Sequence, residues 1–139
     1  MTTTQRPDTD PETLAAATGS IGGNLLAAIT SRSFDQLAGC IEPDATMRAL
    51  LPAGPTEFHG LGEITAAFQK WFGNAVGFEV VNGSVNDVAG RLHVSWQLRA
   101  HPTPRGDEGW HTVEQQVFAH VGERIEALDL LCTGFIPDT

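Results

Sequence analysis

The sequence predicts an α+β domain in which three helices cover one face of a curved antiparallel sheet, so that sheet and helices enclose a cone-shaped pocket. Apolar residues recur at helical spacing in three segments, 14–28, 34–41 and 61–71. From Phe78 onward the apolar spacing changes to two, which is the spacing of strands with one buried face. Helices followed by a run of strands are typical of the α+β class.

The first helix is expected to begin at residues 10–12, Asp-Pro-Glu, because Asp can cap free backbone donors and Pro suits the first helical turn. Its apolar stripe contains Gly19, Gly22 and Gly23, and each glycine costs a helix about 1 kcal/mol relative to alanine. Either another element approaches the backbone closely at these glycines, or the helix breaks there.

The second helix is expected to be short. Ser33 and Gln36 have the spacing of a capping box, and Pro43 is expected to end the apolar stripe that follows them. A strand is predicted over residues 44–51, and a second strand-like segment over residues 57–59, after a loop rich in proline and glycine.

The third helix is predicted over residues 61–71, and Gly73 and Gly77 are expected to end it. The next uncertain point is Asn82-Gly83. This dipeptide indicates either a hairpin turn or a bulge in one strand running from Phe78 to Val88.

Three further strands are predicted over residues 92–100, 110–121 and 125–136. The first of them is the clearest, because apolar and polar residues alternate along its whole length. A polar loop over residues 102–109 is expected to join it to the next strand as a hairpin.

Length and composition favour one globular domain. A chain of 139 residues can bury a single core, and 41% hydrophobic with 18% charged residues is typical of globular proteins rather than disordered ones. We expect a flexible N-terminal segment over residues 1–12 and one domain over residues 13–139.

The charge and the cysteines exclude several classes of partner. A formal net charge of −9 repels phosphate backbones, so nucleic acid is not expected to bind. The sequence has neither an apolar run long enough to span a membrane nor the layout of a signal peptide, which predicts a cytoplasmic protein without membrane contact. Cys40 and Cys132 lack metal-ligand spacing, and we expect two reduced thiols, no metal and no cofactor.

Four short phrases resemble the nuclear transport factor 2-like superfamily, which includes ketosteroid isomerase and SnoaL-like polyketide cyclases. The phrases are SFDQL at 33–37, PDAT at 43–46, HGLGEI at 59–64 and GERI at 122–125, and the match covers roughly residues 14–137. The resemblance implies that the hollow between sheet and helices serves catalysis or ligand binding. It also implies a homodimer formed through the outer face of the sheet.

The function implied by this resemblance is that of a tailoring enzyme, which performs acid–base chemistry on a small hydrophobic organic molecule such as a polyketide. The reaction would be a cyclisation, isomerisation, dehydration or epoxide opening. The alternative is a non-catalytic ligand-binding or assembly domain of the same fold.

Conventional ketosteroid isomerase chemistry needs a carboxylate base and two acidic hydrogen-bond donors. Alignment without gaps puts Leu25 at the position of the family's tyrosine and Ala49 at that of the base, and the chain contains no tyrosine. The position of the protonated aspartate falls at Gln115, or at Glu114 or Gln116 after a shift of one residue. A conventional ketosteroid isomerase is therefore not expected.

The candidate catalytic residues lie on the two strands of the predicted hairpin. Glu114 or His111 could move a proton, and Arg99 could hold an anionic oxygen. Because they are three residues apart on one strand, His111 and Glu114 cannot both point into the hollow without a bulge. The alternative interpretation is a solvated outer sheet face.

The candidate ligand-binding residues combine aromatic and polar side chains. A histidine before the Gly60 turn can point toward the pocket mouth, as in relatives, or can stabilise the turn. The aromatic residues can line a pocket or form ordinary core. The candidates are His59, Phe68, Trp71, Trp96, Gln115 and Gln116.

Two expectations concern the outer face of the sheet. Val113, Val117 and Leu131 are expected to crowd this face, which has no helix to cover it and therefore favours a homodimer. Asp129 is one residue out of phase with the inward positions of relatives, so the outer face is also its expected place.

Overall fold

The computed structural model describes residues 11–101 and 109–138. The segment predicted to be flexible, residues 1–12, lies outside the described residues except for its last two. The predicted loop 102–109 lies outside them except for Gly109.

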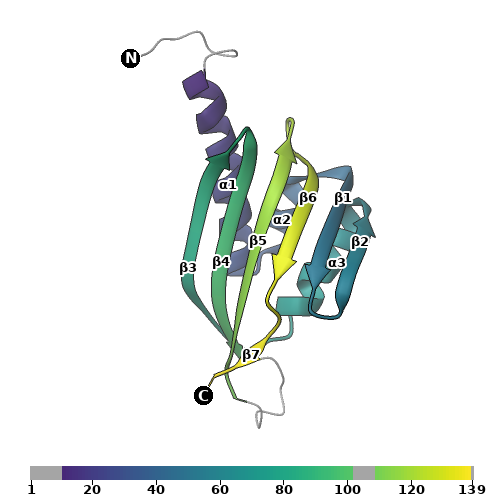
Figure 1. Cartoon of the computed structure of the whole chain (residues 1–139), viewed down its shortest axis with the longest axis vertical. Helices are drawn as coiled ribbons and strands as arrows, with labels where there is room; N and C mark the ends of the chain where they lie inside the picture. The colour runs from purple at the N-terminus through teal and green to yellow at the C-terminus, as the bar shows by residue number, and fades with distance from the viewer. Residues whose placement is uncertain (1–10, 102–108, 139) are drawn as a thin grey trace.

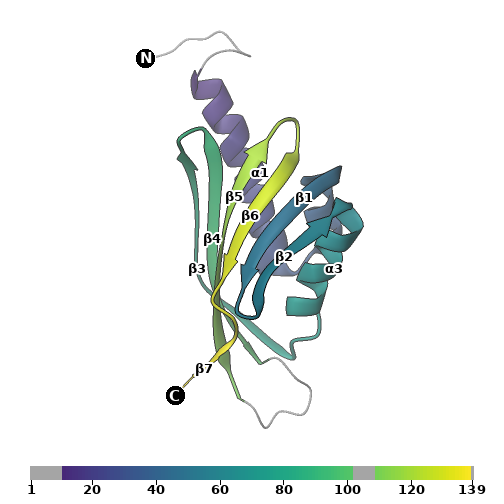
Figure 2. The ribbon, with the colours of Figure 1, turned by 45° about the vertical axis from the view of Figure 1, so that its right-hand side comes forward.

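Over the described residues the chain forms three helices and a sheet of seven strands (Figure 1). The helices are α1 (Pro11–Ser31), α2 (Phe34–Gly39) and α3 (Gly60–Phe72). The strands are β1 (Ile41–Leu51), β2 (Gly54–His59), β3 (Gly77–Val88), β4 (Arg91–His101), β5 (His111–Val121), β6 (Ile125–Cys132) and β7 (Ile136–Pro137). These helices lie on one side of the curved sheet (Figure 2), so the predicted fold class is confirmed.

The strand order is β2-β1-β6-β5-β4-β3, and β7 pairs with β5. Among the described strands, neighbours are antiparallel except β1 and β6, which are parallel. The sheet is therefore antiparallel apart from this pair, which lies one strand in from the β2 edge. Through the pairing of β1 with β6, the two strands that precede α3 in sequence join the strands that follow it.

The helix α1 runs without a break through Gly22 and Gly23. A Cβ atom at Gly22 would lie 2.5 Å from Val85 Cγ1 and 2.8 Å from Leu92 Cδ1, whereas one at Gly23 would meet nothing within 4 Å. At Gly22 the side chains of β3 and β4 thus approach the helix backbone so closely that a larger residue would have to displace Val85 or Leu92. Close approach, rather than a helix break, accounts for this glycine.

The helix α2 begins as predicted, because Ser33 Oγ accepts a hydrogen bond from the Gln36 backbone N–H at 3.3 Å. The strand β1 starts at Ile41, three residues earlier than expected, so Pro43 lies inside a strand instead of ending the helix. The pairing of β1 with β6 shifts register between Ile41 and Thr46. Pro43 fits there because an irregular strand position does not need its missing N–H.

The strand β3 is continuous through Asn82-Gly83, and its register with β4 shifts between Val80 and Asn82. The bulge interpretation is therefore correct and the hairpin interpretation is wrong. A Cβ at Gly83 would lie 3.0 Å from the Leu26 side chain, so packing of α1 on this strand opposes a turn here.

The strand expected over residues 125–136 is divided in two. It ends at Cys132, and β7 begins only at Ile136. Gly134 lies between them with φ of 83°, a conformation that favours glycine and turns the chain out of the strand direction.

On β5 the odd-numbered residues from Val113 to Ala119 are buried against the helices. The prediction that Val113 and Val117 crowd the outer face is therefore wrong, because the strand has the opposite phase. Leu131 does lie on the outer face and is 43% exposed.

Candidate functional site

Aromatic side chains fill the space between the sheet and α3. Phe68, Phe72 and Trp96 are almost completely buried. The Phe68 ring centroid lies 5.1 Å from that of Trp71 and 6.3 Å from that of Trp96, and Phe72 lies 6.2 Å from Phe135. Phe68, Trp71 and Trp96, the three aromatic residues predicted to bind a ligand, thus lie together on the inner side of the sheet.

One chain of hydrogen bonds crosses this apolar interior. Trp96 Nε1 donates to Gln115 Oε1 at 2.9 Å, and Gln115 Nε2 donates to Cys132 Sγ at 3.2 Å. Of the described residues, Gln115 is the one polar residue classed as buried, at 1% exposure. A buried amide costs about 1–3 kcal/mol unless it is hydrogen-bonded, and these two bonds reduce that cost.

The positions that matter for proton transfer in ketosteroid isomerase face the same interior. Leu25 and Ala49 are both buried there, and neither can exchange a proton. Burial raises the pKa of the Cys40 thiol, which keeps it protonated. Within the described part of the chain, the buried interior therefore offers an indole, an amide and thiols but no carboxylate.

The three candidate catalytic residues do not share one face of the sheet. Arg99 follows the outward phase of β4 and Glu114 the outward phase of β5, while His111 shares the phase of the buried residues of β5. His111 Nδ1 lies 3.3 Å from the Gly109 carbonyl oxygen. Their catalytic roles stay predictions.

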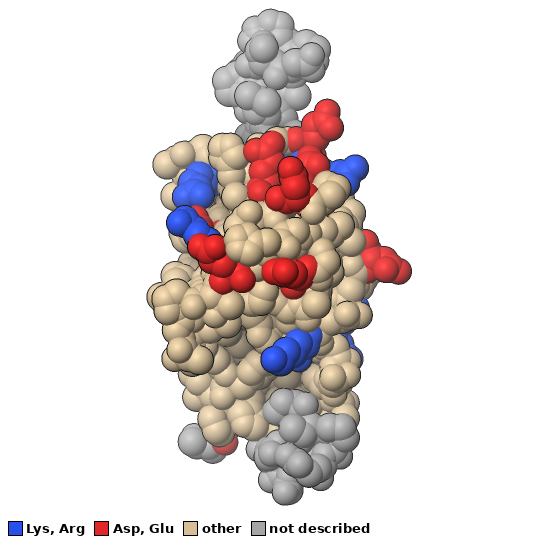
Figure 3. Space-filling view, turned by 90° about the vertical axis from the view of Figure 1, so that its right-hand side faces the viewer, with Lys and Arg blue, Asp and Glu red and all other residues tan. Residues whose placement is uncertain are grey.

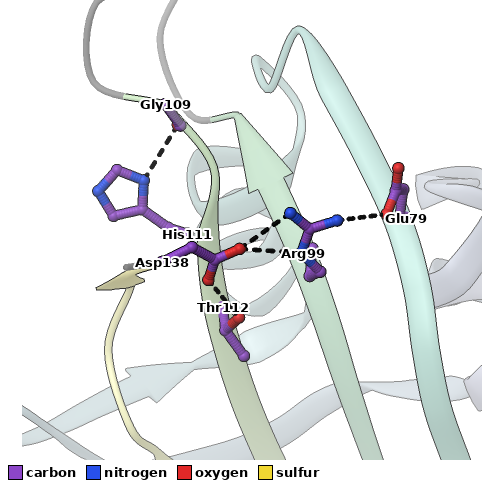
Figure 4. A network of polar contacts seen from close by, with 6 residues as sticks. All are labelled: Glu79, Arg99, Gly109, His111, Thr112 and Asp138. Carbon is purple, nitrogen blue, oxygen red and sulfur yellow. Dashed lines mark hydrogen bonds and ion pairs between the residues drawn. The ribbon is translucent and has the colours of Figure 1, made fainter.

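Arg99 is held between two carboxylates (Figure 4). Its Nε and Nη2 donate to Asp138 Oδ2 at 2.9 Å, and its Nη1 donates to Glu79 Oε1 at 2.7 Å. Its guanidinium also lies 4.9 Å from the centroid of the Trp110 ring. The hydrogen bonds and charges of Asp138 and Glu79 raise the pKa of Arg99. An anionic substrate would have to displace one of these carboxylates.

Asp138 has more partners than Arg99 alone. Thr112 Oγ1 donates to its Oδ1 at 2.8 Å, and its own backbone N–H donates to the Trp110 carbonyl oxygen at 3.0 Å. The hydrogen bonds from Thr112 and then Arg99 lower the pKa of Asp138 below its usual value of 3.8. The carboxylate therefore fastens the end of the chain to β4 and β5.

We expect Asp138→Asn to destabilise the protein at neutral pH, and the difference from wild type to vanish in acid. Because the folded-state pKa of Asp138 is lowered, its stabilisation is present above the unfolded value and is lost as the pH falls through the folded value. Urea unfolding of both proteins from pH 7 to pH 2 measures this. The stability gap should stay level above about pH 5 and close below it. A gap that is independent of pH would contradict the role of the ionised carboxylate.

The outer face of the sheet carries two adjoining hollows of about 600 and 440 Å³, both lined by Leu50 and Leu131. The larger lies over β1, β2 and β6, and its lining includes Arg48, Glu57, Phe118 and Asp129. The smaller lies over β4, β5 and β6, and its lining includes His93, Ser95, Glu114 and Gln116. The candidates Glu114, Gln115 and Gln116 thus line a hollow that opens on the outer face.

Within the smaller hollow, His93 Nε2 lies 2.8 Å from Gln116 Oε1. The ring centroids of His93 and Phe118 are 4.6 Å apart, with an angle of 42° between the planes. Over the described residues, the Glu114 carboxylate makes no ion pair or hydrogen bond. A carboxylate, an imidazole and an amide therefore share this site, beside apolar leucines.

Asp129 lies on the outer face, as predicted, between buried Leu128 and Leu130. Arg48 donates to it through Nε and Nη2, each at 2.9 Å, and Arg91 donates through Nη2 at 3.2 Å. The structure assigns it two ion-pair partners. In Figure 3, which views the molecule from the β2 side, acidic and basic side chains lie next to one another.

His59 has the contacts of a turn residue. Its backbone N–H donates to Glu63 Oε1 at 2.8 Å, and its exposed ring lies 3.3 Å from Glu57 Oε1. The ligand-binding role assigned to His59 from the sequence stays a prediction.

Metal ligands and membrane-spanning helices were looked for among residues 11–101 and 109–138. These residues include no group of three histidine, cysteine or carboxylate side chains placed to hold a metal ion. None of the described helices is long and apolar enough to cross a membrane.

Sequence reasoning missed Cys132 and Asp138. The only signal for their contacts is Gly134, a strand-breaking residue in the last predicted strand, which indicates that the chain changes direction between them.

No family model matches the sequence, and no curated protein matches it. Solved structures do match. A steroid delta-isomerase from Pseudomonas aeruginosa is 16% identical with a TM-score of 0.60, over 84% of this chain and 80% of that one. A candidate polyketide cyclase from Xanthomonas campestris is 12% identical with a TM-score of 0.66, over 84% and 90%.

A nuclear transport factor 2-like protein of unknown function from Cytophaga hutchinsonii is 12% identical with a TM-score of 0.57, over 83% and 88% of the two chains. Structural similarity at sequence identities this low establishes the fold and does not establish the chemistry. The chain therefore shares the fold of the nuclear transport factor 2-like proteins.

Proposed function

We propose that the protein binds a small hydrophobic organic molecule between its sheet and its helices, with Gln115 as the polar contact. The observation that carries this proposal is a single fully buried amide inside an aromatic interior. An amide oxygen accepts two hydrogen bonds and an amide nitrogen donates two, so Gln115 keeps one of each beyond its bonds to Trp96 and Cys132. A ligand with an apolar ring system and one carbonyl or hydroxyl group matches this capacity.

Binding of 1-tetralone and of its hydrocarbon analogue tetralin, followed by tryptophan fluorescence, tests the proposal. We expect Gln115→Leu to weaken binding of the ketone about tenfold and to leave binding of the hydrocarbon nearly unchanged, because only the ketone loses a hydrogen bond. Gln116→Leu is the matched control, since Gln116 is the next residue, follows the outward phase of β5 and contacts His93 instead of Trp96.

Equal effects of the two substitutions would place the ligand outside the interior. Failure of wild type to bind either compound at millimolar concentration would count against the ligand class.

The second candidate function is acid–base tailoring of such a molecule, as the resemblance implies. The observation that favours it is that Glu114 and His93 line the same hollow on the outer face. Glu114 would take a proton from the carbon next to a ketone and return it to the enolate. Deuterium incorporation into 1-tetralone should then fall to background in Glu114→Gln, but not in Glu126→Gln, which removes another exposed carboxylate of the sheet.

We also propose that the protein is a cytoplasmic homodimer formed through the outer sheet face. Leu50 and Leu131 are neighbours in the β1–β6 register and are 52% and 43% exposed. Exposed apolar pairs at the middle of a sheet face are typical of subunit interfaces. Both cysteines are free thiols, which fits a reducing compartment.

We expect Leu131→Arg to convert the dimer to a monomer, because each subunit would then bury a guanidinium group in the interface without a partner for its charge. Light scattering at micromolar concentration measures the mass. Val88→Arg is the matched control, since Val88 is 44% exposed but lies beside the β3–β4 turn. A monomeric wild type, or equal masses for the two variants, would overturn the proposed interface.

A further inference from the structure

The segment from Thr133 to Asp138 continues along the edge of β5 that β6 occupies, since β4 pairs with the opposite edge. Thr133 pairs with the backbone of Glu114 in both directions, through its N–H and its Oγ1, each at 3.0 Å. The segment then passes the β1–β2 turn, where a Cβ on Gly134 would lie 2.7 Å from Pro52 Cγ. It ends beside the first residues of β5, at the lower end of the sheet in Figure 1.

Midway along this segment, Phe135 places its ring against the aromatic interior. The ring centroids of Phe135 and Phe72 are 6.2 Å apart, with an angle of 67° between the planes. Phe135 is half-buried, whereas Phe72 is completely buried. Phe135 is therefore the outermost ring of this contact and covers the buried one.

The rest of the segment buries little. Ile136 is 54% exposed, and Pro137 is exposed as well. The end is held mainly by polar contacts of Asp138 with Arg99, Thr112 and the Trp110 carbonyl, and the two ion-paired side chains are about one-third exposed. Exposed ion pairs of this kind are weak.

We propose that residues 133–138 form a gate over the interior. In this gate the contacts of Asp138 hold the segment against β5, the Phe135 ring covers the interior, and the backbone bends at Gly134. When the contacts of Asp138 break, β7 separates from β5 and Phe135 leaves Phe72, which opens a path to the aromatic interior. The inference rests on the proposed function, because it assumes that the ligand binds there.

The physical basis is a difference in local stability. A two-residue strand with exposed side chains and one polar fastening opens more readily than strands whose side chains are buried. The glycine hinge takes up the change of direction without strain at its positive φ. Detachment therefore needs no unfolding of the sheet, and a minor open population can admit a ligand.

Hydrogen exchange of the full chain, read by mass spectrometry, tests the gate without any ligand. In Asp138→Asn, amides of residues 133–138 should exchange about 3–10-fold faster, while those of residues 125–131 keep the wild-type rate. Asp129→Asn is the matched control, because Asp129 is also paired with arginine and is 33% exposed against 32% for Asp138. It should leave the exchange of residues 133–138 unchanged.

The association rate of 1-tetralone provides the second measurement, and it should rise by a similar factor in Asp138→Asn alone. The gate would be overturned if the amides of residues 133–138 exchanged as slowly as those of residues 125–131, or if they exchanged at the same rate in both variants. An association rate insensitive to Asp138→Asn, for a ketone that does bind through Gln115, would also overturn it. If no protein binds the ketone but the exchange differs as expected, the detachable segment stands and the proposed ligand site fails.

Discussion

Phe72→Ala is expected to lower the free energy of unfolding by about 3–5 kcal/mol. The side chain is 0% exposed, so its removal leaves a cavity that the surroundings can only partly fill. Four other aromatic rings have centroids within 6.5 Å of it, and they lose a packing partner together. These rings belong to Phe68, Trp71, Phe78 and Phe135.

Urea unfolding followed by circular dichroism measures this effect. Phe34→Ala is the control, because Phe34 is half-buried on α2 and lines a hollow on the surface. We expect it to cost about 1–2 kcal/mol, since less apolar area returns to water. Equal costs for the two substitutions would show that Phe72 is not at the centre of a packed interior.

The fold could be predicted from the sequence because its signals are local and repeated. The alternation of β4 from Leu92 to Ala100 has no exceptions, and the structure buries each apolar residue of that series. The outer face could be predicted for Asp129 from the resemblance, because Asp129 is one residue out of phase with the inward positions of relatives.

The phase of β5 could not be predicted in the same way. Its inward series contains the polar residue Gln115, and its outward series contains the aromatic residue Phe118. Each series therefore mixes polar and apolar residues, with His111 and Gln115 in the inward series and Phe118 in the outward one. In the folded protein the inward Gln115 is hydrogen-bonded to Trp96, which is 19 residues away in sequence and which no pattern within β5 indicates.

The partners of Arg99 were also beyond sequence reasoning. Asp138 is 39 residues away from it, and Glu79 is 20 residues away. No periodic pattern specifies either contact. The Asp138 contact depends on where the chain turns after Cys132, which the sequence signals only by Gly134. The Glu79 contact depends on the register of β3 with β4, in which Glu79 is paired directly with Arg99 and which shifts between Val80 and Asn82.

Gly22→Ala is expected to lower the free energy of unfolding by about 1–3 kcal/mol, whereas Gly23→Ala should raise it by up to about 1 kcal/mol. Both substitutions improve the intrinsic helix propensity of α1 by the same amount. They differ in surroundings, since a Cβ at position 22 would lie 2.5 Å from Val85 Cγ1 and 2.8 Å from Leu92 Cδ1, and one at position 23 meets open space.

The difference between the two variants isolates the cost of pushing α1 away from β3 and β4, because the change in helix propensity cancels. Urea unfolding of both proteins beside wild type provides the measurement. If Gly22→Ala is as stable as Gly23→Ala, the helix can move outward without loss and the close approach does not hold it in place. If Gly22→Ala alone is destabilised, and Val85→Ala in the same chain recovers part of the loss, the contact between α1 and β3 fixes the position of the helix over the sheet.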